Sequence, residues 1–289
     1  MKIGSIVTLY YPDVTLLSTL MQIIAWQVDL VCVVDNTPNT TFNVKDLFSS
    51  YENLTYIPFG KNVGIAEAQN RGIKFLKKEA VDFVLFLDQD SIPPQNMVKQ
   101  LMESYLFLSG KGVHVGGVGP RPYNREDGTL YQGFVNKGHP DKMFTPVLDI
   151  ISSASLVPMK LFDQVGGMES SLFIDFVDQE FCWRASREGY KFFICESIRL
   201  NHKVGDGDRS FFFRKIRITS PFRIYFIFRN YLILCRRNYV PFYWKCTVGI
   251  KSFVKLFYFP FFVAPRFEYV KAIWRGVKDG IRNKASVIE

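Results

Sequence analysis

Short apolar runs alternate with amphipathic runs along the first hundred residues. Four runs rich in β-branched and aromatic residues span 3–9, 30–34, 54–57 and 83–87. Apolar residues recur at helical spacing over 14–25, 65–78 and 94–108. Strands and helices that alternate in this way form a mostly parallel sheet flanked by helices on both faces. The pattern therefore predicts an α/β fold.

Polar side chains stand at the end of each of the four predicted strands. In open α/β sheets, ligands bind beyond the carboxyl ends of the strands, where neighbouring loops meet. The residues at these ends are Thr8 and Tyr10, Asp35 and Asn36, Asn62, and Asp88, Gln89 and Asp90. We expect the four loops to converge on one edge of the sheet and to form a ligand site there.

Asp88 and Asp90 carry the clearest chemistry. They follow a buried apolar run and lie two residues apart, so an extended chain directs both carboxylates the same way. Mg²⁺ and Mn²⁺ prefer such oxygen ligands, and Mg²⁺ commonly shares them with substrate phosphates. His202, which follows a strand-like run over 192–200, is a candidate further ligand. The alternative interpretation is a solvated turn that happens to hold two acids.

Two further segments bear on the site. Residues 173–184 have the pattern of a loop that enters a helix, with Asp178 and Glu180 near the helix start. These acids either serve chemistry or only complement the helix macrodipole, and the sequence leaves both interpretations open. Residues 120–146 are rich in Gly, Pro and Asn without periodicity, which predicts a long loop or hairpin insertion over the ligand edge.

The formal net charge of +9 is concentrated in the tail of the 289-residue chain. Residues 201–289 contain 18 Lys and Arg against 5 Asp and Glu, whereas residues 1–200 contain 18 against 22. The tail is also rich in aromatic residues, which suits nucleic acid or an anionic membrane surface. From Pro221 onward we expect two or three short amphipathic helices, with breaks at Pro241, Pro260 and Pro265.

Other features exclude several classes of protein. The longest uncharged stretch of the tail, 256–265, is far shorter than the roughly 20 residues that span a bilayer. The five cysteines show no Cys-x-x-Cys pair and no zinc-site spacing, which indicates reduced, buried thiols. The apolar run at the N-terminus is short and lacks a cleavage site, so we interpret it as a strand and expect a cytoplasmic protein.

Taken in order, these motifs resemble the inverting glycosyltransferases of family two, which have the GT-A fold. Among them they are most similar to the bacterial rhamnosyltransferases of O-antigen and capsule biosynthesis. The stretches that carry the resemblance are 6–8, 33–36, 62–66, 69–72, 86–91, 166–167 and 173–178. The triplet from Asp88 to Asp90 and the stretch from Phe173 to Asp178 are the most typical of rhamnosyltransferases.

The resemblance implies a role for each motif. Asp178 would be the catalytic base, although many family members carry Glu where Val177 stands. Asp175 and Trp183 would lie on the acceptor side. Asp88, Asp90 and His202 would hold Mg²⁺ or Mn²⁺. The implied donor-binding residues are Thr8, Tyr10, Asp35, Asn36, Asn62, Asn70, Asp88, Gln89, Asp90 and Arg209.

The resemblance also implies an architecture and a reaction. A GT-A, Rossmann-like catalytic domain would occupy 1–220, with a nucleotide-binding half over about 1–120 and an acceptor-side half over 121–220. The charge and aromatic content of the tail add a prediction of their own, that a basic, aromatic, helical segment occupies 221–289 and lies on anionic lipid. The reaction would be inverting transfer of L-rhamnose from dTDP-β-L-rhamnose to a lipid-linked oligosaccharide, on the inner face of the cell membrane and without a nucleic-acid partner.

Two alternatives remain at this stage. One is a related family-two transferase that uses a UDP-hexose or UDP-galactofuranose donor, because the sequence does not reveal which sugar hydroxyls are recognised. The other is a non-enzymatic protein that binds RNA or an anionic membrane through its basic tail. The second alternative leaves the acids at the strand ends without an explanation.

Overall fold

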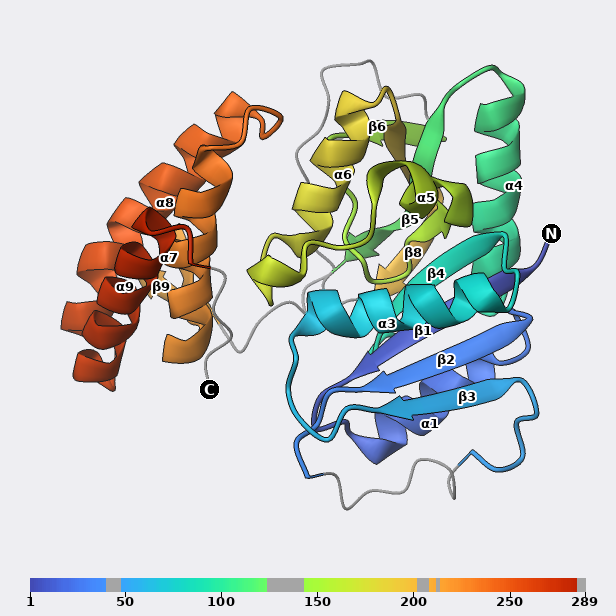
Figure 1. The fold of residues 1–289 in the computed structure, drawn as a ribbon, viewed down its shortest axis with the longest axis horizontal. Helices are drawn as coiled ribbons and strands as arrows, with labels where there is room; N and C mark the ends of the chain where they lie inside the picture. The colour runs from blue at the N-terminus through green and yellow to red at the C-terminus, as the bar shows by residue number, and fades with distance from the viewer. Residues whose placement is uncertain (40–47, 124–142, 202–207, 212–213, 285–289) are drawn as a thin grey trace.

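The computed structural model describes residues 1–39, 48–123, 143–201, 208–211 and 214–284. Within them, eight strands form one sheet in the order β3-β2-β1-β4-β7-β5-β8-β6, with helices on both faces (Figure 1). Three further helices form a group beside the sheet domain, at the left of Figure 1. A separate antiparallel pair consists of β9 (Asp208–Phe211) and β10 (Arg214–Arg217).

The sheet is parallel in its first half and mixed in its second. The parallel half contains β3 (Leu54–Pro58), β2 (Leu30–Asp35), β1 (Ile3–Leu9) and β4 (Phe83–Asp88). The mixed half contains β7 (Leu156–Pro158), β5 (Val115–Tyr123), β8 (Lys191–Asn201) and β6 (Phe144–Val147). β7 is antiparallel to β4 and β5, β8 is parallel to β5, and β6 is antiparallel to β8. The predicted α/β fold is confirmed.

Successive residues of β1 pack into two separate hydrophobic cores, because the side chains of a strand alternate between its faces. Ile6 belongs to the core under α3 (Ile65–Lys78), α5 (Met159–Val165) and α6 (Val177–Arg187). Val7 belongs to the opposite core, under α1 (Val14–Ile24) and α4 (Met97–Gly110). Both faces are therefore covered, as the apolar runs predicted.

The C-terminal helices pack on one another. They are α7 (Pro221–Cys235), α8 (Phe242–Phe262) and α9 (Arg266–Ile281). Two small residues of α9 allow close approach to α7: a Cβ on Gly276 would collide with Tyr225 O, and one on Gly280 with Arg229 O. None of the described helices is long and apolar enough to cross a membrane.

Two expectations about local structure need correction. The ends of the predicted 120–146 insertion are strand, since β5 runs through Pro120 and Pro122 to Tyr123 and β6 starts at Phe144. Beyond Val118, β5 pairs only with β8, so these prolines lose no bond to a strand on the other side. Pro260 does not break the tail but lies in the last turn of α8, which ends two residues later at Phe262. Because proline has no N–H, the helix forgoes one hydrogen bond to the carbonyl four residues earlier.

Candidate active site

Side-chain hydrogen bonds lock the loops after β2 and β3 together. Asp35, the last residue of β2, is buried and accepts a hydrogen bond from the Tyr56 hydroxyl (2.6 Å). Asn36 donates to Asn62 Oδ1 (2.9 Å) and accepts from the Val63 N–H (2.7 Å). The structure thus brings Asp35, Asn36 and Asn62, all predicted to bind the donor, into one hydrogen-bonded corner.

Tyr10 and Gln89 join the end of β1 to the end of β4. The Tyr10 N–H donates to Gln89 Oε1 (2.7 Å), and Gln89 Nε2 donates to the Tyr10 carbonyl (3.1 Å). Thr8 is paired with Asp88 across the same two strands. These four predicted residues therefore lie together at one edge of the sheet. Because its amide already bonds to backbone, Gln89 holds the two strand ends in register.

Four aspartates interact through their charges, and two of them lie at the end of β4. Burial, followed by the charge of Asp90, raises the pKa of Asp88 from 3.8 to about 6. Burial also raises the pKa of Asp178 to about 6; hydrogen bonds from backbone N–H groups oppose the rise and the charge of Asp88 adds to it. Burial and the charge of Asp178 raise the pKa of Asp149 to about 7. Asp90, Asp88, Asp178 and Asp149 are thus successively coupled, which we call the aspartate group.

The carboxylates of Asp88 and Asp90 fit a divalent cation. Oxygen ligands suit Mg²⁺ and Mn²⁺, and a cation beside the two carboxylates would offset the repulsion that raises the Asp88 pKa. In the part of the chain that the structure describes, no three or more His, Cys, Asp or Glu residues are grouped to hold a metal. The predicted ligand His202 lies outside that part, and Arg209 lies on β9 with its side chain undescribed.

Asp178 lies in the first turn of α6. Its Oδ1 accepts from the Gln179 N–H (2.9 Å), and its Oδ2 accepts from the Ser152 N–H (3.3 Å). A carboxylate at this position complements the helix start, as the macrodipole interpretation expected. The same carboxylate also feels the charge of Asp88, which lies at the end of β4. The position of Asp178 thus fits the macrodipole interpretation, and its role as catalytic base stays a prediction.

The backbone in front of α6 is strained. Phe173, Asp175 and Phe176 have φ angles of 65°, 65° and 67°, although none of them is glycine. Residues held in this region cost on the order of 1–3 kcal/mol each and cluster at functional sites. Asp175, predicted to lie on the acceptor side, forms an ion pair with Arg223 of α7. Side chains from the tail therefore contact the segment that leads into the predicted base.

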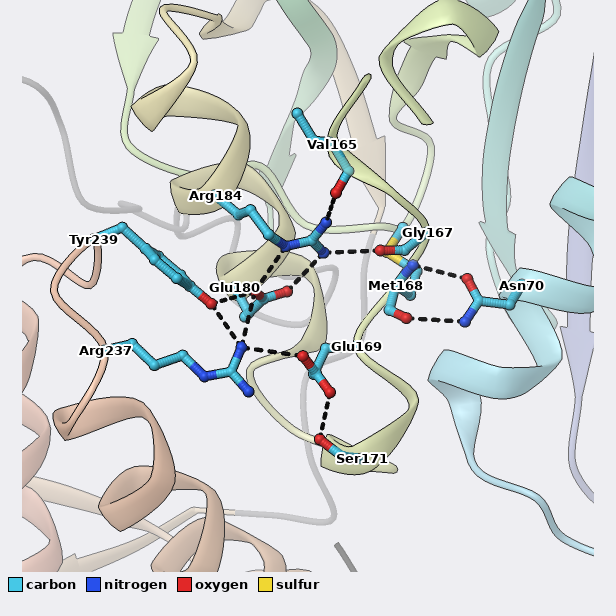
Figure 2. A network of polar contacts seen from close by, with 10 residues as sticks. All are labelled: Asn70, Val165, Gly167, Met168, Glu169, Ser171, Glu180, Arg184, Arg237 and Tyr239. Carbon is cyan, nitrogen blue, oxygen red and sulfur yellow. Dashed lines mark hydrogen bonds and ion pairs between the residues drawn. The ribbon is translucent and has the colours of Figure 1, made fainter. Parts of the chain in front are cut away.

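A buried ionic network surrounds the next turn of α6 (Figure 2). Glu180 is fully buried and accepts two hydrogen bonds of 2.9 Å from Arg184, four residues later. Nη1 of Arg237, in the connection between α7 and α8, donates to Glu180 (3.4 Å) and to Glu169 (3.0 Å). The Tyr239 hydroxyl donates to Glu180 at 2.6 Å. The network joins the tail to α6, so Glu180 has a structural role.

Asn70 and Arg184 hold the two sides of the glycine turn before α6 (Figure 2). Asn70 donates to the Met168 carbonyl (2.9 Å) and accepts from the Met168 N–H (2.7 Å). Arg184 donates to the carbonyls of Val165 and Gly167. A Cβ on Gly167 would collide with Asn70 Oδ1, which explains the need for glycine there. Asn70 thus fixes this turn, and its part in donor binding stays a prediction.

Trp183, predicted to lie on the acceptor side, is buried. Its side chain is 2% exposed and packs edge-on against Trp244 of α8, with ring centroids 4.9 Å apart. The nearby indole N–H favours the ionised form of Asp149 and so opposes the rise in its pKa. Among the described atoms, however, neither Trp183 Nε1 nor Asp149 Oδ2 has a partner within hydrogen-bond geometry. Direct contact between Trp183 and an acceptor therefore stays a prediction.

Sequence reasoning missed three of these residues. Asp149 follows an apolar pair and belongs to no motif, so nothing in the sequence indicated that it joins the aspartate group. Glu169 and Arg237 lie 68 positions apart, and only the fold brings them together. The pair of Glu180 and Arg184 did carry a signal, because acid and base four residues apart share one side of a helix.

Comparisons with known proteins show the family to which the chain belongs. Residues 12–166 match the family described as glycosyl transferase family 2. The chain is 30% identical over 290 residues to the dTDP-rhamnosyl transferase RfbF of Shigella flexneri, covering 97% of this chain and 96% of that protein. It is 25% identical over 215 residues to the low-salt glycan biosynthesis hexosyltransferase Agl10 of Haloferax volcanii, covering 68% and 64%.

Solved structures share the fold at low sequence identity. S. aureus TarS superposes with a TM-score of 0.59 at 15% identity, over 99% of this chain and 50% of that one. GalNAc-T7 with UDP, GalNAc and Mn²⁺ superposes with a TM-score of 0.56 at 11% identity, over 97% and 55%. The match to the family and the similarity over nearly the full length lead to one conclusion. This chain belongs to glycosyl transferase family 2 and is a glycosyltransferase with the GT-A fold.

Proposed function

We propose that this glycosyltransferase moves L-rhamnose from dTDP-β-L-rhamnose, with inversion, to a hydroxyl of a lipid-linked oligosaccharide in cell-surface polysaccharide synthesis. The observation that carries the proposal is the aspartate group, in which Asp178 faces the charge of Asp88 at the nucleotide edge of the sheet. The donor is supported by 30% identity, over nearly the full length, to a protein named dTDP-rhamnosyl transferase.

Asp178 acts as the general base in this proposal. The acceptor oxygen attacks the anomeric carbon, and its proton passes to the Asp178 carboxylate as the new C–O bond forms. The bond between that carbon and the β-phosphate oxygen breaks, and its electron pair leaves with dTDP. Attack from the opposite face inverts the centre, so a β-linked donor gives an α-L-rhamnoside. General-base assistance of this kind contributes roughly 10²–10⁴-fold to the rate.

In this proposal the donor nucleotide binds at the edge of the sheet where β1, β2 and β4 end. The corner formed by Asp35, Asn36 and Asn62 is pre-organised by its own hydrogen bonds, which reduces the ordering cost of binding a nucleoside. Asp88 and Asp90, with His202 as a further candidate, would hold Mg²⁺ or Mn²⁺. When bound, the cation supplies positive charge against the diphosphate and so favours its departure. Asp90 is exposed, as a ligand shared with a substrate phosphate needs to be.

The test is turnover with a panel of nucleotide sugars. Purified protein is incubated with Mn²⁺, an octyl glycoside panel and, separately, dTDP-β-L-rhamnose, a UDP-hexose or UDP-galactofuranose. We expect release of dTDP and formation of an α-L-rhamnoside with the first donor. Turnover with a UDP-sugar alone would refute the donor assignment while leaving the transferase class intact. A β-linked product would refute inversion.

We also propose that the tail docks on an anionic membrane surface. The exposed side of α8 carries Tyr243, Ile250, Phe253, Phe257 and Phe261, at the spacing of one helical stripe. Phe253, for example, has 63% of its surface exposed. Large exposed apolar patches of this kind usually mark a docking surface.

α9 adds a second exposed stripe with a basic border. Phe267, Val270, Trp274 and Ile281 are exposed at the same spacing, and Lys271, Arg275, Lys278 and Arg282 lie beside them. Residues 242–284 contain nine Lys and Arg but two Asp and Glu. A second copy of the chain would meet like charge at this surface, whereas anionic lipid offers the opposite charge and an apolar interior.

Liposome sedimentation tests the docking. The double variant Phe253→Ser, Phe257→Ser removes exposed rings and should weaken binding to vesicles containing phosphatidylglycerol by at least tenfold. Trp26→Ser, an exposed ring outside the tail, is the matched control and should bind like the wild type. Equal binding by all three proteins, or dimerisation that the double variant abolishes, would refute the lipid assignment.

A further inference from the structure

The segment 171–176 covers the last two residues of the short 3₁₀ helix Ser170–Leu172 and the four residues before α6, whose second residue is Asp178. Phe176 caps the start of α6 in the left-handed region, with a φ of 67°, and makes no side-chain capping bond there. The Phe176 carbonyl accepts the Glu180 N–H at 2.9 Å, which starts the hydrogen bonding of the helix. Because three non-glycine residues have positive φ, the segment needs outside contacts to keep this shape.

Two buried side chains of α7 supply these contacts. Asn230 Nδ2 donates to the carbonyls of Leu172 (2.9 Å), Ile174 (2.8 Å) and Asp175 (3.1 Å). Arg229 donates through Nη2 to the carbonyls of Ser171 and Leu172, the second at 3.1 Å. Arg229 Nε also donates to Asn230 Oδ1 at 3.0 Å, so the two side chains act on the segment as one unit.

A third contact ties the segment to the nucleotide side. The Phe173 ring stacks on Phe226 of α7, with centroids 4.8 Å apart and planes 6° apart. The Phe173 carbonyl accepts the Ala66 N–H (3.4 Å) at the start of α3. A Cβ on Gly64 would come within 2.6 Å of the Phe173 ring, so the segment lies tightly between α7 and the loop before α3.

We propose that Asn230 and Arg229 are positioning residues for glycosyl transfer, because they hold the segment 171–176 in the strained shape that presents Asp178. The inference rests on the proposed role of Asp178 as base. In this inference α7 supports the catalytic site, whereas α8 and α9 carry the proposed membrane surface.

The test separates positioning from folding. Asn230→Leu keeps the size of the side chain and removes its donors, so Asp178 is no longer held in place. A misplacement of about 1 Å costs on the order of 10²-fold in rate. We therefore expect kcat per folded molecule to fall about 100-fold, with an unchanged KM for the donor. Tyr231→Phe, which removes a hydrogen bond from α7 to the Lys245 carbonyl, is the matched control and should retain kcat.

Two more variants keep the test decisive if Asn230→Leu folds poorly. Arg223→Gln removes the ion pair to Asp175 at a side chain that is 39% exposed, and should lower kcat several-fold without affecting folding. Arg229→Lys keeps a cationic donor and should retain more kcat than Arg229→Met. Wild-type kcat in folded Asn230→Leu or in Arg223→Gln would overturn the proposal, as would equal losses in kcat and donor affinity. If the wild type turns over only another nucleotide sugar, the donor assignment fails and the same comparison is made with that sugar.

Discussion

Asp149→Asn offers a quantitative test of the aspartate group, because it removes a buried charge that takes no part in the proposed chemistry. Asp149 is 8% exposed, accepts one long hydrogen bond from Gln179 (3.4 Å), and has a pKa of about 7 in place of 3.8. Burial is the first cause of this rise and the charge of Asp178 the second. A carboxyl whose folded-state pKa is raised binds its proton more tightly in the folded protein than in the unfolded chain. Its ionisation therefore lowers the free energy of unfolding as pH rises toward and through 7.

The size of the Asp149 pKa shift sets how much the free energy of unfolding falls as pH rises. A rise of about three pKa units corresponds to roughly 4 kcal/mol well above pH 7, of which roughly 2–3 kcal/mol develops between pH 5 and pH 8.5. Asn has no charge to bury, so the variant should lack this loss. The amide introduces a buried donor, and leaving it unpaired costs about 1–3 kcal/mol at every pH. The pH dependence of stability, and not its absolute value, is therefore the decisive quantity.

This pH dependence is measured by thermal unfolding of the wild type and of Asp149→Asn in EDTA at pH 5 and pH 8.5. For a chain of this size, 1 kcal/mol shifts Tm by about 2–4 °C. Between the two pH values, we expect the wild type to lose about 4–12 °C more than Asp149→Asn does. Glu188→Gln, which neutralises an exposed acid at the end of α6, is the matched control and should follow the wild type. Parallel pH profiles for wild type and Asp149→Asn would refute the assignment of a raised pKa.

Three further predictions concern the same site. The acidic limb of kcat/KM should lie near pH 6, because Asp178 must be ionised to act as base and its pKa is raised to about 6; a limb near pH 4 contradicts this. Asp90→Ala should abolish Mn²⁺-dependent donor binding by calorimetry, and unchanged affinity would exclude Asp90 as a ligand. Glu180→Gln should lower the free energy of unfolding by about 3–5 kcal/mol in urea titrations, because Arg184 and Arg237 lose a buried partner, and a loss below 1 kcal/mol would contradict the network.

The sequence predicted the parallel half of the sheet well because each element there has its own local signal. β1 and α3 have the predicted bounds, and the polar residues after β1, β2 and β4 do meet at one edge. Hydrophobic periodicity reports on burial, and both faces of this half are buried. The mixed half was harder to predict, because β5 contains prolines and β6 and β7 are short.

The contacts that support the site were not predictable for a different reason. Asn230 was visible only as part of the tail, yet it bonds to carbonyls more than fifty residues earlier. Asn70 has the motif position of a donor-binding residue, but its amide bonds to Met168, 98 positions away. Backbone carbonyls leave no trace in sequence, so side chains that bind them cannot be told from side chains that bind a ligand.

Asp178→Asn tests the central claim most directly. The substitution preserves size and removes basicity, so transfer should fall at least 100-fold while calorimetric affinity for the donor with Mn²⁺ stays within about twofold of the wild type. Glu188→Gln, at the C-cap of the same helix, should keep both quantities. Folded Asp178→Asn protein that binds the donor normally and retains near-normal turnover would contradict the assignment of Asp178 as the base.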